Sequence, residues 1–224
     1  DVGRRGEGVD DGLVDHGVVE TLKLDGIACV SRTAINRTAF MAALRIGLPE
    51  EMKLFPDRIP LIHLSAHGSE EGIQLSSDEV MTWDELRDQL VPINQSLNGN
   101  LLLFMSACQG YSACQMAMRD GDGPHPFLGM VGSPHSPMWS DTAIAYLTLY
   151  HLLAKGKTIP EAVSAMKVVS GCAWFFESAD TLRKCYVDII ANSAQPKAAQ
   201  QRLEAIASEG GLPAEAKALE RDVK

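Results

Sequence analysis

The pattern of apolar and polar positions divides this chain into short apolar runs separated by segments with helical spacing. Two of the runs end in reactive residues, the first in His67-Gly68 and the second in Cys108-Gln109-Gly110. Short apolar runs closed by glycine are typical of buried parallel strands. We therefore predict strands over 61–66, 101–106 and 127–131, with a further strand within 18–30.

Helical spacing and capping signals lie between these runs. Ser31–Ile46 places its apolar residues on one side, and the following Gly47-Leu48-Pro49 is expected to end that helix. Thr82 and Glu85 form a capping-box pattern that opens a helix to about residue 90. A small hairpin or loop is expected over 72–81 and a helix over 111–118.

The second half of the chain is predicted to be mostly helical. Ser140 or Asp141 is expected to cap a long helix over Thr142–Lys155. Thr158 and Glu161 form a second capping box, which opens a helix to about residue 169.

Alternating strands and helices predict an α/β fold. We expect a three-layer α/β/α sandwich in which helices cover both faces of a mostly parallel central sheet. The chain is expected to have three parts: a polar, Gly-rich flexible leader over 1–17, an α/β domain over 18–178 and a C-terminal helical extension over 179–224.

Composition and charge exclude some classes of partner. The 224 residues are 46% hydrophobic, which is enough for one sizeable core. The net charge of −9 leaves no basic stripe for nucleic-acid phosphates or an anionic membrane surface. No apolar run approaches the roughly 20 residues that span a bilayer, and no signal peptide is visible. The five sparse cysteines favour reduced thiols and a cytoplasmic location, and the start at Asp1 allows a fragment or a processed product.

Cys108 and His67 are the candidate nucleophile and base. Reactive groups in an open α/β sheet collect at the carboxyl ends of the strands, and both residues follow predicted strands. The helix expected after Cys108 would favour its thiolate, and Gly68 and Cys108 could each present a backbone N–H to an oxyanion. Each residue also has a structural alternative: a packed cysteine, and a histidine satisfied by a nearby carbonyl.

The residues around Cys108 carry a resemblance to a known family. Ser106–Gly110 matches four of the five positions of the caspase signature Q-A-C-[RQG]-G, which has a His about 50 residues upstream; His67 lies 41 residues upstream. The chain therefore resembles the caspase-like (clan CD) cysteine peptidases, and more closely their bacterial CHAT-domain branch.

The similarity extends beyond this motif and spans about residues 18–170. A Trp-Ser-Asp loop at 139–141, an apolar helix, a glycine and an Ile-Pro-Glu-Ala-Val helix start follow in the order of the CHAT branch. The chain departs from the family in Ser106, which replaces Gln, in the Pro- and His-rich loop 133–138, and in the lack of an evident first strand and helix before Val18.

The resemblance implies a cysteine endopeptidase that cleaves a protein or peptide substrate through an acyl-enzyme. Cys108 would attack the scissile carbonyl, His67 would act as general acid and base, and the N–H groups of Gly68 and Cys108 would hold the oxyanion. Bacterial relatives often sit in multi-domain or multi-protein switches, so the resemblance also allows a regulatory protein or domain as partner, and it implies no cofactor. The alternative is a catalytically silent caspase-like domain that binds other proteins.

Asp141, Trp139 and His135 are the candidate substrate-binding residues. A carboxylate at Asp141 would favour Arg or Lys at P1, although a helix N-cap accounts for it equally well. Trp139 could wall the pocket or pack, and His135 could line the cleft or lie on a surface loop. His63 lies on the same side of the predicted strand as His67. No close Cys/His spacing supports a zinc site, so no metal is expected. A metal-dependent hydrolase is the third class of function considered.

Overall fold

A computed structural model describes residues 19, 22–23, 26–192 and 196–210. The chain divides into two compact units. We call the first the sheet unit, which comprises Thr33–Ser136 and Ala173–Lys224, and the second the hairpin unit, which comprises Asp1–Arg32 and Pro137–Cys172. Each unit is described by itself, and the leader predicted over 1–17 lies outside the described residues.

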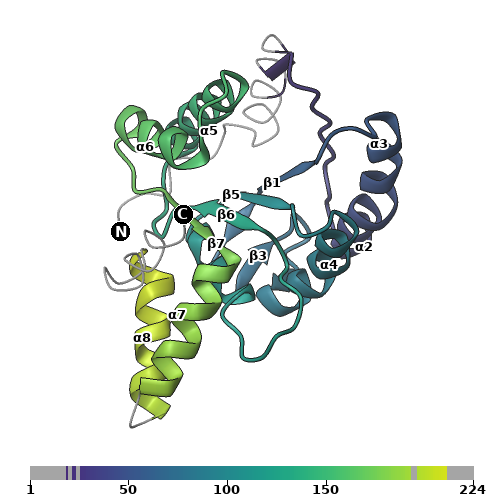
Figure 1. The fold of residues 1–224 in the computed structure, drawn as a ribbon. Coiled ribbons are helices and arrows are strands. Elements are labelled where there is room, and N and C mark those ends of the chain that lie inside the picture. The colour runs from purple at the N-terminus through teal and green to yellow at the C-terminus, as the bar shows by residue number, and fades with distance from the viewer. Residues whose placement is uncertain (1–18, 20–21, 24–25, 193–195, 211–224) are drawn as a thin grey trace, which may run out of the picture. The chain divides into compact units, whose positions relative to one another are not determined.

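The sheet unit is built on a four-stranded sheet with the strand order β1-β5-β6-β7 (Figure 1). Its strands are β1 (Leu61–Ser65), β5 (Leu102–Ser106), β6 (Gly129–Gly132) and β7 (Phe175–Ser178). β1, β5 and β6 run parallel, and β7 pairs antiparallel with β6. The predicted α/β class with a mostly parallel sheet is thus confirmed. β7 was not predicted, because its four residues include the buried Glu177, which interrupts the apolar pattern.

A small antiparallel sheet follows β1 in the chain. It contains β2 (His67–Gly68), β3 (Gly72–Gln74) and β4 (Val80–Thr82), which confirms the hairpin predicted over 72–81. A Cβ at Gly72 would overlap with the carbonyl oxygen of Met81, so the close approach of β3 and β4 requires glycine there.

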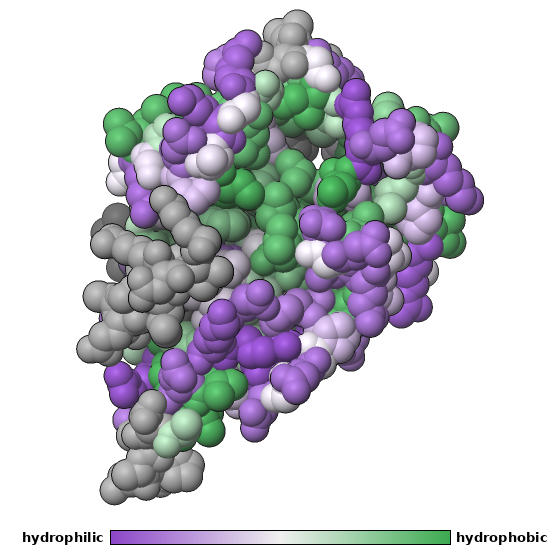
Figure 2. Space-filling view, viewed as in Figure 1, coloured by the Kyte–Doolittle hydropathy of each residue, from purple (hydrophilic) through white to green (hydrophobic). Residues whose placement is uncertain are grey.

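Seven helical segments belong to the sheet unit in its described part. They are α2 (Arg37–Ala42), the π-helical turn η1 (Ala43–Gly47), α3 (Leu48–Leu54), α4 (Trp83–Ser96), the 3-10 helix η2 (Gly110–Met116), α7 (Ala179–Asn192) and α8 (Pro196–Glu209). One face of the sheet, represented by Ile62, Leu103 and Met105, contributes to the hydrophobic core. The core also contains residues from α2, η1, α4, η2, α7 and α8. Hydrophilic side chains predominate where α4 reaches the surface in Figure 2, as expected for an amphipathic helix.

The two ends of α4 are fixed by side-chain hydrogen bonds. The predicted capping box is present, with Thr82 Oγ1 accepting from the N–H of Glu85 and the Glu85 carboxylate accepting from the N–H of Thr82. The helix continues past residue 90, where we expected it to end, because Pro92 is accommodated inside it. Near its C-terminus the buried Asn94 accepts from the N–H of Leu101 and donates to the carbonyl of His125, which ties the helix to the start of β5.

The hairpin unit consists mainly of α5 (Trp139–Ala154) and α6 (Ile159–Ser170), which pack against each other. Gly156, with φ +79°, adopts the left-handed conformation that ends α5. The predicted capping box of Thr158 and Glu161 opens α6. Neither these helices nor the others within the described ranges are long and apolar enough to span a bilayer.

Other element predictions are wrong. The described residues within 18–30 include helical positions at 22–23 and no strand. Gly47-Leu48-Pro49 does not end the first helix, because the chain continues through η1 into α3, where Pro49 occupies a first-turn position that needs no backbone N–H. Neither Ser140 nor Asp141 caps α5: its N-cap is Met138, which makes no side-chain capping bond, and both residues lie in the first turn.

Candidate functional site

His67 lies where the chain passes from the large sheet to the small one. β1 pairs with β5 along its length, and the last pair is Ser65 with Ser106. The N–H of Ala66 then donates to the carbonyl of Ser106 at 3.2 Å, so the two strands end together. His67 follows directly, with an exposed side chain.

Cys108 lies on a tight turn after β5. Its side chain is half-buried, and the next residue, Gln109, has a left-handed backbone with φ 52°. The N–H of Gly110 donates to the carbonyl of Ala107 at 3.0 Å and closes the turn. The helix that follows is the seven-residue 3-10 helix η2 and not the α-helix we expected. A short helix has a smaller dipole, so it favours the Cys108 thiolate less than an α-helix would.

Gly68 packs directly on the main chain of Cys108. A Cβ at Gly68 would overlap with the Cys108 carbonyl oxygen and would lie 3.0 Å from Cβ of Ala107. No side chain larger than hydrogen therefore fits between the two strand ends. The structure brings the backbones of the predicted His-Gly and Ala-Cys segments into contact at the carboxyl edge of the sheet.

Two backbone N–H groups at this contact are not used by the β2–β3 ladder or by the Cys108 turn. The N–H of Ser69 donates to the carbonyl of Gly72 at 2.9 Å, so Ser69 and Gly72 form a hydrogen-bonded pair. Hydrogen-bonded and non-hydrogen-bonded pairs alternate along an antiparallel ladder. The next pair, Gly68 with Ile73, is therefore not hydrogen-bonded, and the N–H of Gly68 points away from β3. Within the described ranges, the N–H of Cys108 has no hydrogen-bond acceptor. Both groups were the predicted donors to an oxyanion.

The loop after β6 holds the Cys108 turn through main-chain hydrogen bonds. The carbonyl of His135 accepts from the N–H of Gln109 at 2.8 Å, and the carbonyl of Ser133 accepts from the N–H of Tyr111 at 2.9 Å. A Cβ at Gly132 would lie 2.8 Å from the backbone N of Tyr111, so this approach also depends on glycine. His135 is therefore next to the Cys108 turn, with its own side chain exposed.

Trp139 and Asp141 belong to the hairpin unit. Both side chains are half-buried in the first turn of α5. Because Asp141 is not the N-cap, the structural alternative that we considered for it is wrong. Its role, and that of Trp139, in binding a substrate stays a prediction.

Three of the other four cysteines have a raised pKa. Burial raises the pKa of the Cys114 thiol far above its ordinary value, and the Glu177 carboxylate and Cys185 raise it further. Burial also raises the pKa of Cys185 and of Cys29. A raised pKa disfavours the thiolate, so these three cysteines are poor nucleophiles.

His63 is the second histidine of β1. Its side chain is half-buried, and desolvation lowers its pKa to about 4. A neutral imidazole is the form expected at pH 7. Among the residues that the structure describes, no group of three or more His, Cys, Asp or Glu side chains is arranged to hold a metal ion.

The sequence analysis did not single out two residues whose backbone shapes the Cys108 turn. Gln109, with its left-handed conformation, and Ser133, with its carbonyl bond to Tyr111, both shape the turn. Neither position carries a side-chain signal for such a role. One glycine follows or ends each of three strands, and these glycines were the available signal that the backbones approach closely there: Gly68, Gly110 and Gly132.

Comparisons with known proteins leave the family of this chain open. No protein-family model matches the sequence. No curated protein matches it either. The resemblance to caspase-like peptidases therefore rests on the motifs quoted above.

Proposed function

We propose that this chain is a cysteine peptidase domain of the caspase-like, CHAT type, with Cys108 as nucleophile and His67 as general acid and base. The observation that carries the proposal is the contact between Gly68 and the Cys108 main chain. This contact supports the proposal because the segments that carry His67 and Cys108 meet there. The finer fold of the family, a three-layer α/β/α sandwich, is part of the same proposal.

The reaction would proceed by acyl transfer. Cys108 Sγ gives its proton to His67 and attacks the scissile carbonyl, and the N–H groups of Gly68 and Cys108 bind the resulting oxyanion. His67 then protonates the leaving amine as the C–N bond breaks, which leaves a thioester on Cys108. A water molecule hydrolyses the thioester, with His67 accepting its proton, and releases the carboxylic acid and the free thiol.

The substrate class follows from charge and from the resemblance. A net charge of −9 favours basic over acidic polypeptides, and the Asp141 carboxylate would bind Arg or Lys at P1 through charge-assisted hydrogen bonds. All five cysteines are free thiols. A cytoplasmic location, a protein substrate and control by a regulatory partner complete the proposal.

Covalent labelling tests the dyad. Folded protein is treated with a peptidyl acyloxymethyl ketone carrying Arg at P1, and the modified residue is located by mass spectrometry of digested protein. We expect one adduct, on Cys108, and a loss of about 10²- to 10⁴-fold in labelling rate for His67→Ala. Cys172→Ala is the matched control, since Cys172 is also half-buried and should not affect labelling.

Absence of an adduct would favour the silent binding domain. The decisive result is folded protein, verified by circular dichroism, that stays unlabelled by ketones with Arg, Asp and Leu at P1. Labelling of Cys172 or Cys29 in place of Cys108 would equally overturn the proposed dyad.

A further inference from the structure

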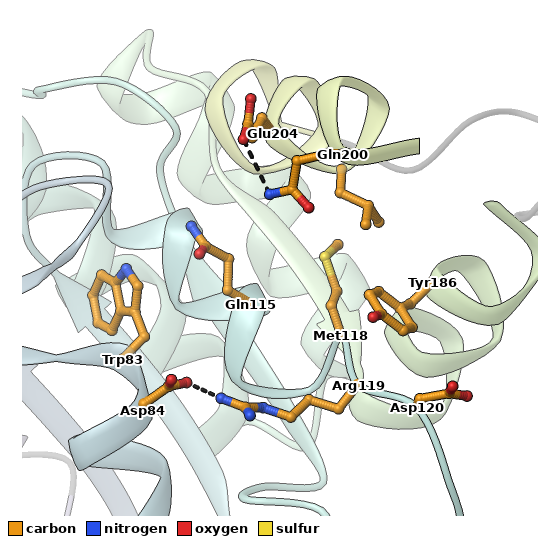
Figure 3. A pocket seen from close by; sticks show the side chains of 10 residues that line it. Trp83, Asp84, Gln115, Met118, Arg119, Asp120, Tyr186, Gln200 and Glu204 are labelled. Atoms are coloured by element: carbon orange, nitrogen blue, oxygen red, sulfur yellow. Dashed lines mark hydrogen bonds and ion pairs between the residues drawn. The ribbon is translucent and has the colours of Figure 1, made fainter. Parts of the chain in front are cut away.

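A cavity of about 430 Å³ lies between α4, η2, α7 and α8 of the sheet unit, apart from the Cys108 turn (Figure 3). Its volume falls in the range of about 300–1,000 Å³ that is usual for small-molecule sites. Neither His67 nor Cys108 lines it. Its occupant would therefore be distinct from the peptide of the proposed peptidase, and binding there is independent of peptidase activity.

Three apolar side chains contribute to the floor of the cavity. Trp83, Met118 and Leu203 line it and are themselves at least nine-tenths buried. The indole N–H of Trp83 donates to the carbonyl of Glu70 at 2.8 Å, and the Gln115 amide donates to the same oxygen at 3.2 Å. These bonds fix two walls of the cavity, so its shape is preformed.

The rim of the cavity is acidic. Four charged residues line it, and three of them are Asp84, Asp120 and Glu204. The fourth, Arg119, forms an ion pair with Asp84 (Figure 3). This pair leaves the carboxylates of Asp120 and Glu204 without a cation among the lining residues.

The remaining lining groups support a cationic ligand. The Gln200 amide donates to the Glu204 carboxylate at 3.0 Å, which orients that carboxylate. The phenol ring of Tyr186 lies on the same side of the cavity as Met118 and could contact an ammonium group through its face (Figure 3). The ligand that fits apolar side chains between two separated carboxylates is an apolar chain that ends in a cation.

We propose that this cavity binds an organic cation carried on an alkyl chain, an ammonium or guanidinium group whose methylenes cover Trp83, Met118 and Leu203 and whose charge meets Asp120 or Glu204, which lie at opposite sides of the cavity (Figure 3). Two sources share this chemistry: a free alkyl diamine, and the Lys or Arg side chain of a peptide.

Titration with small probes tests the proposal. Isothermal calorimetry with the full chain compares 1,6-diaminohexane with hexane-1,6-diol and with adipate, which have the same chain length and differ in charge. We expect millimolar or tighter binding of the diamine, weaker binding of the diol and none of adipate. Ethylenediamine, with fewer methylenes, should bind roughly tenfold more weakly than 1,6-diaminohexane. The tripeptide Ac-Ala-Lys-Ala-NH₂, titrated in parallel, separates a peptide source from a free amine.

Two neutral variants locate the site. Asp120→Asn and Glu204→Gln keep the volume of the side chain, and each should weaken diamine binding about two- to fivefold. Asp122→Asn, in the same loop as Asp120, and Glu209→Gln, on the same helix as Glu204, lie outside the cavity lining and serve as matched controls.

Thermal melting of each variant confirms that it is folded, so a loss of binding can be read as a loss of the site. The proposal is overturned if the diamine fails to bind at millimolar concentration, if diol and diamine bind equally, or if the cavity variants bind the diamine as the controls do.

Discussion

At the scale of the residue, Gly68 is the position on which the geometry of the candidate site depends. Gly68→Ala would push a methyl group into the Cys108 carbonyl, so the two strand ends must separate. We expect a loss of about 1–3 kcal/mol in the free energy of unfolding, measured by urea denaturation, together with slower labelling of Cys108.

Gly123→Ala is the control for this substitution. A Cβ at Gly123 would meet no atom within 4 Å, so the variant should match the wild type in stability and labelling. Equal stability of the Gly68 and Gly123 variants would show that the strand ends are not in the contact described.

His63 makes stability depend on pH. Its pKa is about 4 in the folded chain and 6.5 when unperturbed, so the unfolded chain binds a proton first as the pH falls. Stability should therefore decrease from pH 6.5 to pH 4 by an amount on the order of 3 kcal/mol. Urea denaturation across this range should give a flatter profile for His63→Gln than for the wild type.

The apolar pattern predicted that the strands preceding His67 and Cys108 end at the same edge of the sheet, and the backbones of Gly68 and Cys108 are in contact there. The roles of the two side chains stay a prediction. The left-handed conformation of Gln109 could not be inferred, because Gln is not a residue that favours it. The bonds from the Ser133 and His135 carbonyls could not be inferred either, since every residue has a carbonyl.

At the scale of the element, the two capping boxes determine where α4 and α6 begin. Thr82→Ala removes the acceptor for the Glu85 N–H and should cost about 1 kcal/mol in the free energy of unfolding, measured by urea denaturation. Hydrogen bonds from the backbone and side chain of Thr82, and Arg37, lower the pKa of Glu85. A lowered carboxylate pKa means that this stabilisation is present above the ordinary pKa and is lost as the pH falls through the folded value.

Amide hydrogen exchange provides the check on this pH dependence. Protection in the first turn of α4 should fall below about pH 4.5 in the wild type. In Glu85→Gln it should be lower and should not change over the same range. A first turn whose protection is the same at pH 3 and pH 6 in the wild type would contradict the prediction.

Element predictions succeeded where a local signal was strong and failed where tertiary contacts decide. Both capping boxes, with their reciprocal side-chain bonds, were predicted correctly. β7 forms only because β6 supplies a partner across the sheet. The end of the first helix was missed because proline signals both the end of one helix and the first turn of the next.

At the scale of the whole molecule, the net charge of −9 should influence how a substrate approaches. Raising the ionic strength from 0.01 M to 0.15 M shortens the Debye length from about 30 Å to about 8 Å. If Cys108 acts on basic peptides, the labelling rate by an Arg-P1 ketone should fall roughly tenfold over this range. A Leu-P1 ketone, which carries no charge, should show little change, and equal salt dependence of the two reagents would contradict electrostatic steering.

The loop after β6 has a consequence for protein engineering. It supports the Cys108 turn with the main-chain carbonyls of Ser133 and His135, and the exposed side chain of His135 takes no part in those bonds. Randomising the exposed positions 135 and 136 in a library should therefore leave the sulfur where it is. Laboratory selection could then alter the chemistry around the nucleophile without rebuilding its scaffold.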